Sequence, residues 1–249
     1  ILRRKIERVQ VVSFDVFDTL LKRNCASPHD IFDIVEKRYN ILHNEKVKEF
    51  RKKRIHAEKI ARGLNDSGEA TLDEIYKNLQ MEGSDVLKQI EISCEFDYCV
   101  ANSFAKEIYD YAVKSGKIVI CISDMYLSSN HIKKMLTKAG YENISYVFVS
   151  SEFKMSKHRG NLFEKVSYKL SAGTNMILHI GDNWRSDYIV PLSRGIKAYH
   201  ISRDILNIKN ISRTEKQEKN RIFTAVINNN ITTKKENSNE SYRYGYEIL

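Results

Sequence analysis

The apolar residues of this chain follow two patterns, one typical of buried strands and one of amphipathic helices. Stretches dominated by apolar residues occur at 9–14, 117–123, 146–150 and 176–180, a fifth strand candidate lies at 197–201, and stretches with helical periodicity separate them. Such runs predict strands that are covered on both faces, as in a parallel sheet. Because strands and helices alternate at these lengths, we predict an α/β fold with a three-layer, Rossmann-like doubly wound parallel sheet.

The longest helical stretch lies between the first two predicted strands. Residues 25–101 carry apolar positions at helical spacing and show no strand pattern. An insert of this length exceeds an ordinary crossover connection between two parallel strands. We therefore expect it to be a separate helical cap over a core formed by residues 1–24 and 102–205.

Two helix starts in this insert can be predicted from their capping residues. Ser27 is a favourable N-cap, and Pro28 is a favourable first helical residue. Thr71 and Glu74 have the spacing of a capping box, which predicts the start of another helix.

The last part of the chain differs in composition from the rest. Residues 206–249 are rich in Asn, Lys, Glu, Ser and Thr and mostly lack an apolar period, which is typical of a linker or adaptor. The final residues, Tyr242–Leu249, are apolar and aromatic again, so we expect them to lead into a further domain.

The charge of the chain favours anionic partners. Lys and Arg number 41 against 32 Asp and Glu, which gives a formal net charge of +9. The densest basic run, Lys46–Arg54, includes Val47 and Phe50, as expected for an amphipathic helix with a solvated face, and it is also a candidate for attracting an anionic substrate. No zinc-finger spacing or RNA-binding aromatic signature accompanies the basic residues, so we expect no nucleic-acid partner.

The cysteines and the hydropathy indicate where the protein works. Cys25, Cys94, Cys99 and Cys121 include no CxxC pair, and a reduced, cytoplasmic setting fits them best. No apolar run approaches the roughly twenty residues that a membrane helix needs, and no signal-peptide pattern opens the chain. We therefore expect no membrane span.

Polar residues suited to catalysis follow the predicted strands at their carboxyl ends. They are Asp15, Ser123, Lys157, Asp182 and Asp187. Parallel strands bring such residues to one edge of the sheet, where ligands bind. Each also has a structural alternative, because Asp15 could form a turn, Ser123 could cap a helix, and Lys157 could be a solvated lysine with Lys154 as its rival in the site. His179, inside an apolar strand, is better explained as a packed core histidine than as a ligand.

The order and spacing of these residues resemble the four motifs of the haloacid dehalogenase superfamily. The resemblance covers about residues 9–201, and the helical insert after the first motif is similar to the family's C1 type of cap. The matching segments are Phe14-Asp15-Val16-Phe17-Asp18-Thr19, Ile122-Ser123-Asp124, Lys157 with Gly160, and Gly181-Asp182-Asn183-Trp184-Arg185-Ser186-Asp187.

This resemblance implies a phosphoryl-transfer site. Asp15 would be the nucleophile, Ser123 would bind the transferring phosphoryl group, and Lys157 would balance the negative charge. An anionic nucleophile approaches a phosphoryl group only if a cation neutralises the charge, and Mg²⁺ prefers oxygen ligands. The ligands that the resemblance implies for Mg²⁺ are Asp15, the backbone carbonyl of Phe17, Asp182 and Asp187.

One position departs from the pattern of most phosphatases of the superfamily. They carry a second Asp two residues after the nucleophile as general acid and base, whereas this chain has Phe17 there and Asp18 one residue later. Loss of a general acid lowers the rate by roughly 10²–10⁴. Asp18 is therefore a candidate catalytic residue, and the reaction type stays open, because dehalogenases, phosphonate hydrolases and transport ATPases of the superfamily also lack that Asp.

Two functions agree with these features. The first is a Mg²⁺-dependent phosphohydrolase that acts on a phosphorylated small molecule or glycan end through an aspartyl-phosphate on Asp15. The alternative is a catalytically weakened domain that serves as a binding or regulatory module of a glycosyltransferase or capsule-synthesis protein. The amino-acid sequences of the first two motifs resemble those of a bacterial branch of the superfamily that occurs with glycosyltransferases of surface-polysaccharide synthesis. A glycosyltransferase domain is therefore a candidate partner.

Overall fold

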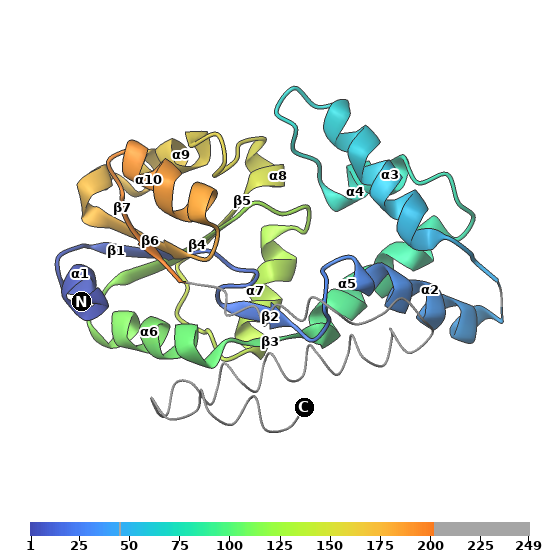
Figure 1. The fold of residues 1–249 in the computed structure, drawn as a ribbon, viewed down its shortest axis with the longest axis horizontal. Coiled ribbons are helices and arrows are strands. Elements are labelled where there is room, and N and C mark those ends of the chain that lie inside the picture. The colour runs from blue at the N-terminus through green and yellow to red at the C-terminus, as the bar shows by residue number, and fades with distance from the viewer. Residues whose placement is uncertain (45, 202–249) are drawn as a thin grey trace, which may run out of the picture.

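A parallel sheet forms the centre of the protein. The computed structural model describes residues 1–44 and 46–201. Its main sheet has five strands in the order β5-β4-β1-β6-β7, and every neighbouring pair is parallel (Figure 1). The strands are β1 (Val11–Phe14), β4 (Ile118–Ser123), β5 (Tyr146–Val149), β6 (Ile177–Gly181) and β7 (Lys197–His200). The predicted doubly wound α/β fold is confirmed.

Helices cover both faces of this sheet and make it the middle of three layers. Val12 and Phe14 of β1 belong to the apolar cluster on one face, whereas Val11 belongs to the cluster on the other, because successive strand residues point to opposite sides. The first face is covered by α1 (Leu2–Glu7), α6 (Ser103–Lys114) and α7 (Ser129–Lys138), and the second by α9 (Asn161–Leu170). Shorter elements complete the core: α8 (Ser150–Phe153), η1 (Thr174–Met176), η2 (Trp184–Ile189) and α10 (Val190–Ser193).

The long insert after β1 lies beside the sheet (Figure 1). Its described residues form α2 (Asp30–His43), α3 (Phe50–Gly63), α4 (Leu72–Lys77) and α5 (Ser84–Tyr98). We call these helices and the loops between them the cap. The division of the chain into a core of 1–24 and 102–205 and a cap of 25–101 stays a prediction.

A short antiparallel ribbon joins the cap to the core, and here the expectation of a strand-free insert was wrong. Strands β2 (Leu21–Arg23) and β3 (Cys99–Ala101) pair with each other, and Asn24 N donates a hydrogen bond of 2.8 Å to Tyr98 O. Each strand has three residues, too few to produce a visible alternation of apolar and polar positions. The ribbon brings the two ends of the cap together at the edge of the core.

The two predicted helix starts had different outcomes. The capping box of α4 is confirmed: Thr71 N donates to Glu74 at 2.7 Å, and Glu74 N donates to Thr71 Oγ1 at 3.2 Å. The start at Ser27 was wrong, because α2 begins at Asp30. The side chain of Asp30 accepts a hydrogen bond of 2.8 Å from Ser27 N, so Ser27 donates to the helix start instead of capping it.

The basic run at the start of α3 does not form a purely solvated face. Arg54 is completely buried, and its guanidinium donates two hydrogen bonds of 2.8 Å to Glu91 and one of 3.0 Å to Glu58. The rings of Phe32 and Tyr126 lie 4.8 and 4.6 Å from its central carbon. Paired carboxylates and aromatic faces satisfy a charge that would otherwise be too costly to bury. The prediction holds for Lys52 and Lys53, which are exposed.

Two further expectations can be compared with the structure only in part. Within 1–44 and 46–201, no helix combines the length and the apolar character that a membrane crossing requires. The predicted linker at 206–249 and the apolar ending Tyr242–Leu249 lie outside the described residues, as do the last residues assigned to the core.

Candidate active site

A cavity of about 590 Å³ opens at the carboxyl ends of β1, β4 and β6. All the candidate catalytic and ligating residues line this cavity, and all of them come from the core. Ser123, at the end of β4, is almost completely buried. These residues are Asp15, Phe17, Asp18, Ser123, Lys157, Asp182 and Asp187. The cap contributes His29, Phe32, Glu58 and Arg62. The strand-end residues predicted from the sequence therefore meet around one cavity.

Asp15 lies directly after β1 and is held by the neighbouring strand. Its backbone N donates to Ile180 O at 2.9 Å, and its side chain is buried next to Lys157, with 2.5 Å between Oδ1 and Nζ. Burial raises the pKa of Asp15 to about 8; Lys157 opposes this shift, and Asp187 and Asp182 add to it. Three buried carboxylates, Asp15, Asp182 and Asp187, therefore lie together beside Lys157.

Lys157 bridges two of the carboxylates. Its Nζ donates to Asp15 Oδ1 and, at 2.6 Å, to Asp187 Oδ1. Burial opposes the charge on the amine, but these two carboxylates raise the pKa of Lys157 above its ordinary value. Asp124 holds the loop, because its carboxylate accepts from the backbone N of Lys157 at 2.8 Å and of His158 at 3.3 Å. Of the two rival lysines, Lys157 lines the cavity, whereas Lys154 forms an ion pair of 2.5 Å with Glu74 of the cap.

Asp182 and Asp187 follow β6 and are fixed by different donors. Asp182 Oδ1 accepts from the Thr19 hydroxyl at 3.1 Å, which connects it to the first motif. Asp187 Oδ2 accepts from Asn183 N at 3.0 Å. A Cβ on Gly181 would lie 2.5 Å from Asp187 Cγ, so only glycine permits this close approach. Burial disfavours charge on Asp187, but Lys157 and His179 hold its pKa below the ordinary value.

The geometry fits a small divalent cation. Asp15, Asp182 and Asp187 are all buried, and each offers a carboxylate oxygen within 4.8 Å of the other two. Oxygen ligands of this kind suit Mg²⁺, and its charge would offset the mutual repulsion of the three carboxylates. The assignment of the Phe17 carbonyl as a further ligand stays a prediction.

A cation–π pair occupies the position where most phosphatases of the superfamily have their second Asp. The guanidinium carbon of Arg23 lies 4.2 Å from the centre of the Phe17 ring. Arg23 also donates to both oxygens of the buried Glu95, at 2.9 and 3.2 Å. Asp18, which also lines the cavity, has the left-handed backbone φ of 63°, a conformation uncommon for residues other than glycine.

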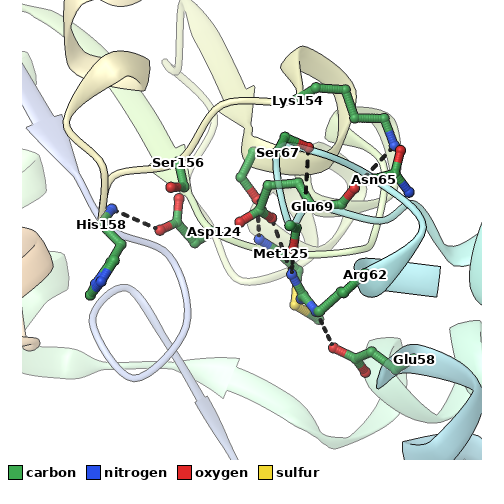
Figure 2. A network of polar contacts seen from close by, with 12 residues as sticks. Glu58, Arg62, Asn65, Ser67, Glu69, Asp124, Met125, Lys154, Ser156 and His158 are labelled. Carbon is green, nitrogen blue, oxygen red and sulfur yellow. Dashed lines mark hydrogen bonds and ion pairs between the residues drawn. The ribbon is translucent and has the colours of Figure 1, made fainter. Parts of the chain in front are cut away.

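A network of polar contacts connects the cap to the core near the cavity, and Figure 2 shows how its residues face one another. Arg62 of α3 donates to Glu58 at 2.9 Å and to Glu69, in the following loop, at 3.3 Å. Glu69 accepts a hydrogen bond of 2.6 Å from the Ser150 hydroxyl of the core, which accepts from Met125 N at 3.0 Å. The cap loop thus contacts the segment that directly follows Ser123.

Several of these residues could not be singled out from the sequence. Arg23, Arg62 and Glu69 are ordinary charged residues in helical or loop sequence and carry no motif. His179 was expected to be a packed core residue; it is buried, but both ring nitrogens are hydrogen-bonded, to Ser13 at 2.8 Å and Asp187 at 3.2 Å. The only sequence feature that could have pointed to this contact is that Ser13 and His179 are polar residues within otherwise apolar strands.

Comparison with known proteins identifies the fold. No family model and no curated protein matches the chain. Solved structures do match. A defluorinating L-2-haloacid dehalogenase is similar with a TM-score of 0.59 and 15% identity, over 83% of this chain and 86% of that protein.

Two other similar structures contain magnesium. The HAD-hydrolase YfnB from Bacillus subtilis, bound to magnesium, has a TM-score of 0.55 and 16% identity, over 81% of this chain and 92% of its own. A HAD family enzyme from Bacteroides thetaiotaomicron, in complex with magnesium and inorganic phosphate, has a TM-score of 0.52 and 12% identity, over 81% and 98%. At these identities the matches establish a shared fold, that of the haloacid dehalogenase (HAD) enzymes.

Proposed function

We propose that this chain belongs to the HAD superfamily and is a Mg²⁺-dependent phosphohydrolase of a phosphorylated small molecule or glycan end. The observation that carries the proposal is the buried arrangement in which Lys157 bridges Asp15 and Asp187 beside Asp182. Positioning and electrostatic stabilisation dominate phosphoryl transfer, and this cluster supplies both.

The reaction divides into two steps at Asp15. In the first, a carboxylate oxygen of Asp15 attacks phosphorus, the bond between phosphorus and the leaving-group oxygen breaks, and an aspartyl phosphate forms. In the second, the oxygen of a water molecule attacks phosphorus, the bond between phosphorus and the Asp15 oxygen breaks, and the proton lost by the water leaves with inorganic phosphate or passes to solvent, which regenerates the free carboxylate. Lys157 balances the charge of Asp15 and of the transferring group, and the Ser123 hydroxyl donates to a phosphoryl oxygen. Asp15, Asp182, Asp187 and the Phe17 carbonyl would hold Mg²⁺, which would supply the charge that offsets repulsion between nucleophile and phosphate.

The acidic residues favour phosphoryl chemistry over dehalogenation. Similar structures include dehalogenases, and the aromatic residue at position 17 leaves that reaction type open. A phosphate ester, however, needs a cation beside its nucleophile, and three clustered carboxylates fit one. We assign protonation of the leaving group to Asp18, because the Phe17 side chain has no acidic proton to donate and Asp18 lines the same cavity.

The alternative is a catalytically weakened domain that binds a phosphorylated group or a partner. The pairing of Phe17 with Arg23 favours it, because this pair replaces an acid and base with side chains that do not transfer protons at neutral pH. The partner in that case is a glycosyltransferase or capsule-synthesis protein in the cytoplasm.

A screen of phosphomonoesters with and without Mg²⁺ distinguishes the two. If the protein is a hydrolase, we expect release of inorganic phosphate that requires Mg²⁺, and we expect the Asp182→Asn variant to release none. Mg²⁺ binding without turnover of any ester would favour the binding domain. Metal-independent release of halide from a 2-haloacid would overturn both in favour of dehalogenation.

A further inference from the structure

Two polar side chains lie inside the central sheet, behind the cavity. Ser13 of β1 and His179 of β6 are completely buried and stand opposite each other in the strand register. The Ser13 hydroxyl is 2.8 Å from His179 Nδ1, and His179 Nε2 is 3.2 Å from Asp187 Oδ1. The contacts continue from Asp187 to Lys157 and from Lys157 to Asp15. One chain of contacts therefore runs from the sheet interior to the nucleophile.

The direction of these hydrogen bonds follows from the groups that make them. The Asp187 carboxylate only accepts, so His179 carries its proton on Nε2 and donates it to Oδ1. In the neutral ring Nδ1 is then an acceptor, and the Ser13 hydroxyl donates to it. The ring of Phe163 meets His179 edge to face, with centroids 4.9 Å apart, and restricts its orientation further.

We propose that Ser13 and His179 are positioning residues that fix the Asp187 carboxylate, so that Asp187 Oδ1 aims Lys157 at Asp15 and keeps its place in the cation site. The consequence for turnover rests on the proposed function, whereas the positioning itself does not. Asp187 Oδ1 accepts hydrogen bonds from Lys157 Nζ at 2.6 Å and His179 Nε2 at 3.2 Å, and a longer one from the Ser186 hydroxyl at 3.4 Å. Its other oxygen is held by Asn183 N at 3.0 Å, so removal of the histidine donor leaves one side of the carboxylate less constrained.

Simple core packing does not account for this arrangement. A packed side chain in the middle of an apolar sheet is most favourably apolar, and each buried polar group needs a partner to offset its lost hydration. Here the partners form a directed chain that ends on a candidate cation ligand. Ligating carboxylates are commonly held by such partners outside the ligand set, and their loss weakens metal affinity or activity.

Two substitutions of His179 separate positioning from packing. In His179→Gln the amide nitrogen lies near the position of Nε2 and can donate to Asp187. In His179→Asn it lies near the position of Nδ1 and reaches Ser13 but not Asp187. We expect His179→Gln to retain most of the Mg²⁺ affinity and kcat, and His179→Asn to lose about 10–100-fold in either or both with little change in KM. Equal losses in the two variants, or no loss in either, would overturn the proposal.

Two further measurements keep the test independent of turnover and of folding. Side-chain nitrogen NMR of the metal-free wild-type protein should show His179 protonated at Nε2. Protonation at Nδ1 alone would contradict the proposed hydrogen bond from His179 to Asp187. Ser13→Ala, checked for an intact fold by its thermal midpoint, should lower Mg²⁺ affinity in the same direction as His179→Asn. Unchanged affinity would overturn the role of Ser13. If no ester is hydrolysed, the proposed function fails, while the tautomer and Mg²⁺ affinity still decide the positioning role.

Discussion

The guanidinium of Arg23 lies 4.2 Å from the ring centre of Phe17, at the position where most superfamily phosphatases have their acid and base. Replacing the phenylalanine would therefore not simply restore a general acid. In Phe17→Asp the new carboxylate would face Arg23, and a neighbouring cation favours the charged form and lowers a carboxyl pKa. We expect less than about a tenfold gain in kcat on alkyl phosphates, far below the factor of about 10²–10⁴ that a matched general acid supplies. A gain of that full size would contradict this role of Arg23.

Asp18 gives a second, separate prediction. If its carboxyl protonates the leaving group, Asp18→Asn should lower kcat/KM for an alkyl phosphate by about 10²-fold or more. An activated aryl phosphate leaves without protonation, so its loss should be much smaller. Steady-state kinetics with both esters make the comparison, and equal losses on the two would exclude Asp18 as the acid.

Gly181 is predicted to be indispensable because of Asp187. A Cβ at position 181 would lie 2.5 Å from Asp187 Cγ and Oδ2, so Gly181→Ala must displace the carboxylate. We expect Mg²⁺ affinity and kcat to fall by at least about 10-fold, as when a ligating group is moved. Gly63→Ala is the matched control, since a Cβ there would meet nothing within 4 Å and Gly63 lies in α3 with an ordinary helical backbone. Isothermal titration with Mg²⁺ compares the two, and equal affinities would contradict the prediction.

Arg54 should matter for stability more than for substrate attraction. Its guanidinium and the carboxylate of Glu91 are both completely buried, so Arg54→Ala leaves an uncompensated charge in the cap. Breaking a buried pair in this way lowers the free energy of unfolding by about 3–5 kcal/mol. Lys53→Ala, on the exposed face of the same helix, is the control and should change it by less than about 0.5 kcal/mol. Denaturant titration of both variants gives the comparison, and a near-neutral Arg54→Ala would count against the buried pair.

The fold could be predicted from the sequence because its signals are local. Most strands of the parallel sheet are short runs dominated by apolar residues; Ser123 ends one of them, and Asp15 and Asp182 directly follow two others. The carboxyl ends of parallel strands share one edge, and these residues meet there because β1 lies between β4 and β6. The shared edge, together with the order and spacing of the motifs, allowed the candidate site to be assembled without a structure.

The contacts that surround the site depend on distant parts of the chain. Ser13 and His179 are 166 positions apart and meet only because β1 and β6 are paired in one particular register. The burial of Arg54 depends on Glu91 and on Tyr126 of the core, although the sequence around Arg54 predicts a basic, solvated helix face. Strands β2 and β3 are too short to leave a pattern. Pairing and packing between segments far apart in the sequence, which periodicity does not encode, decide all three.

The central claim is that Asp15 accepts the phosphoryl group. Acid quenching of the protein during turnover of a phosphomonoester with Mg²⁺, followed by peptide mapping, tests it directly. We predict a phosphoryl group on the Asp15 side chain, and its absence together with loss of turnover in Asp15→Asn. Phosphate found on another residue, or wild-type turnover by Asp15→Asn, would contradict the account.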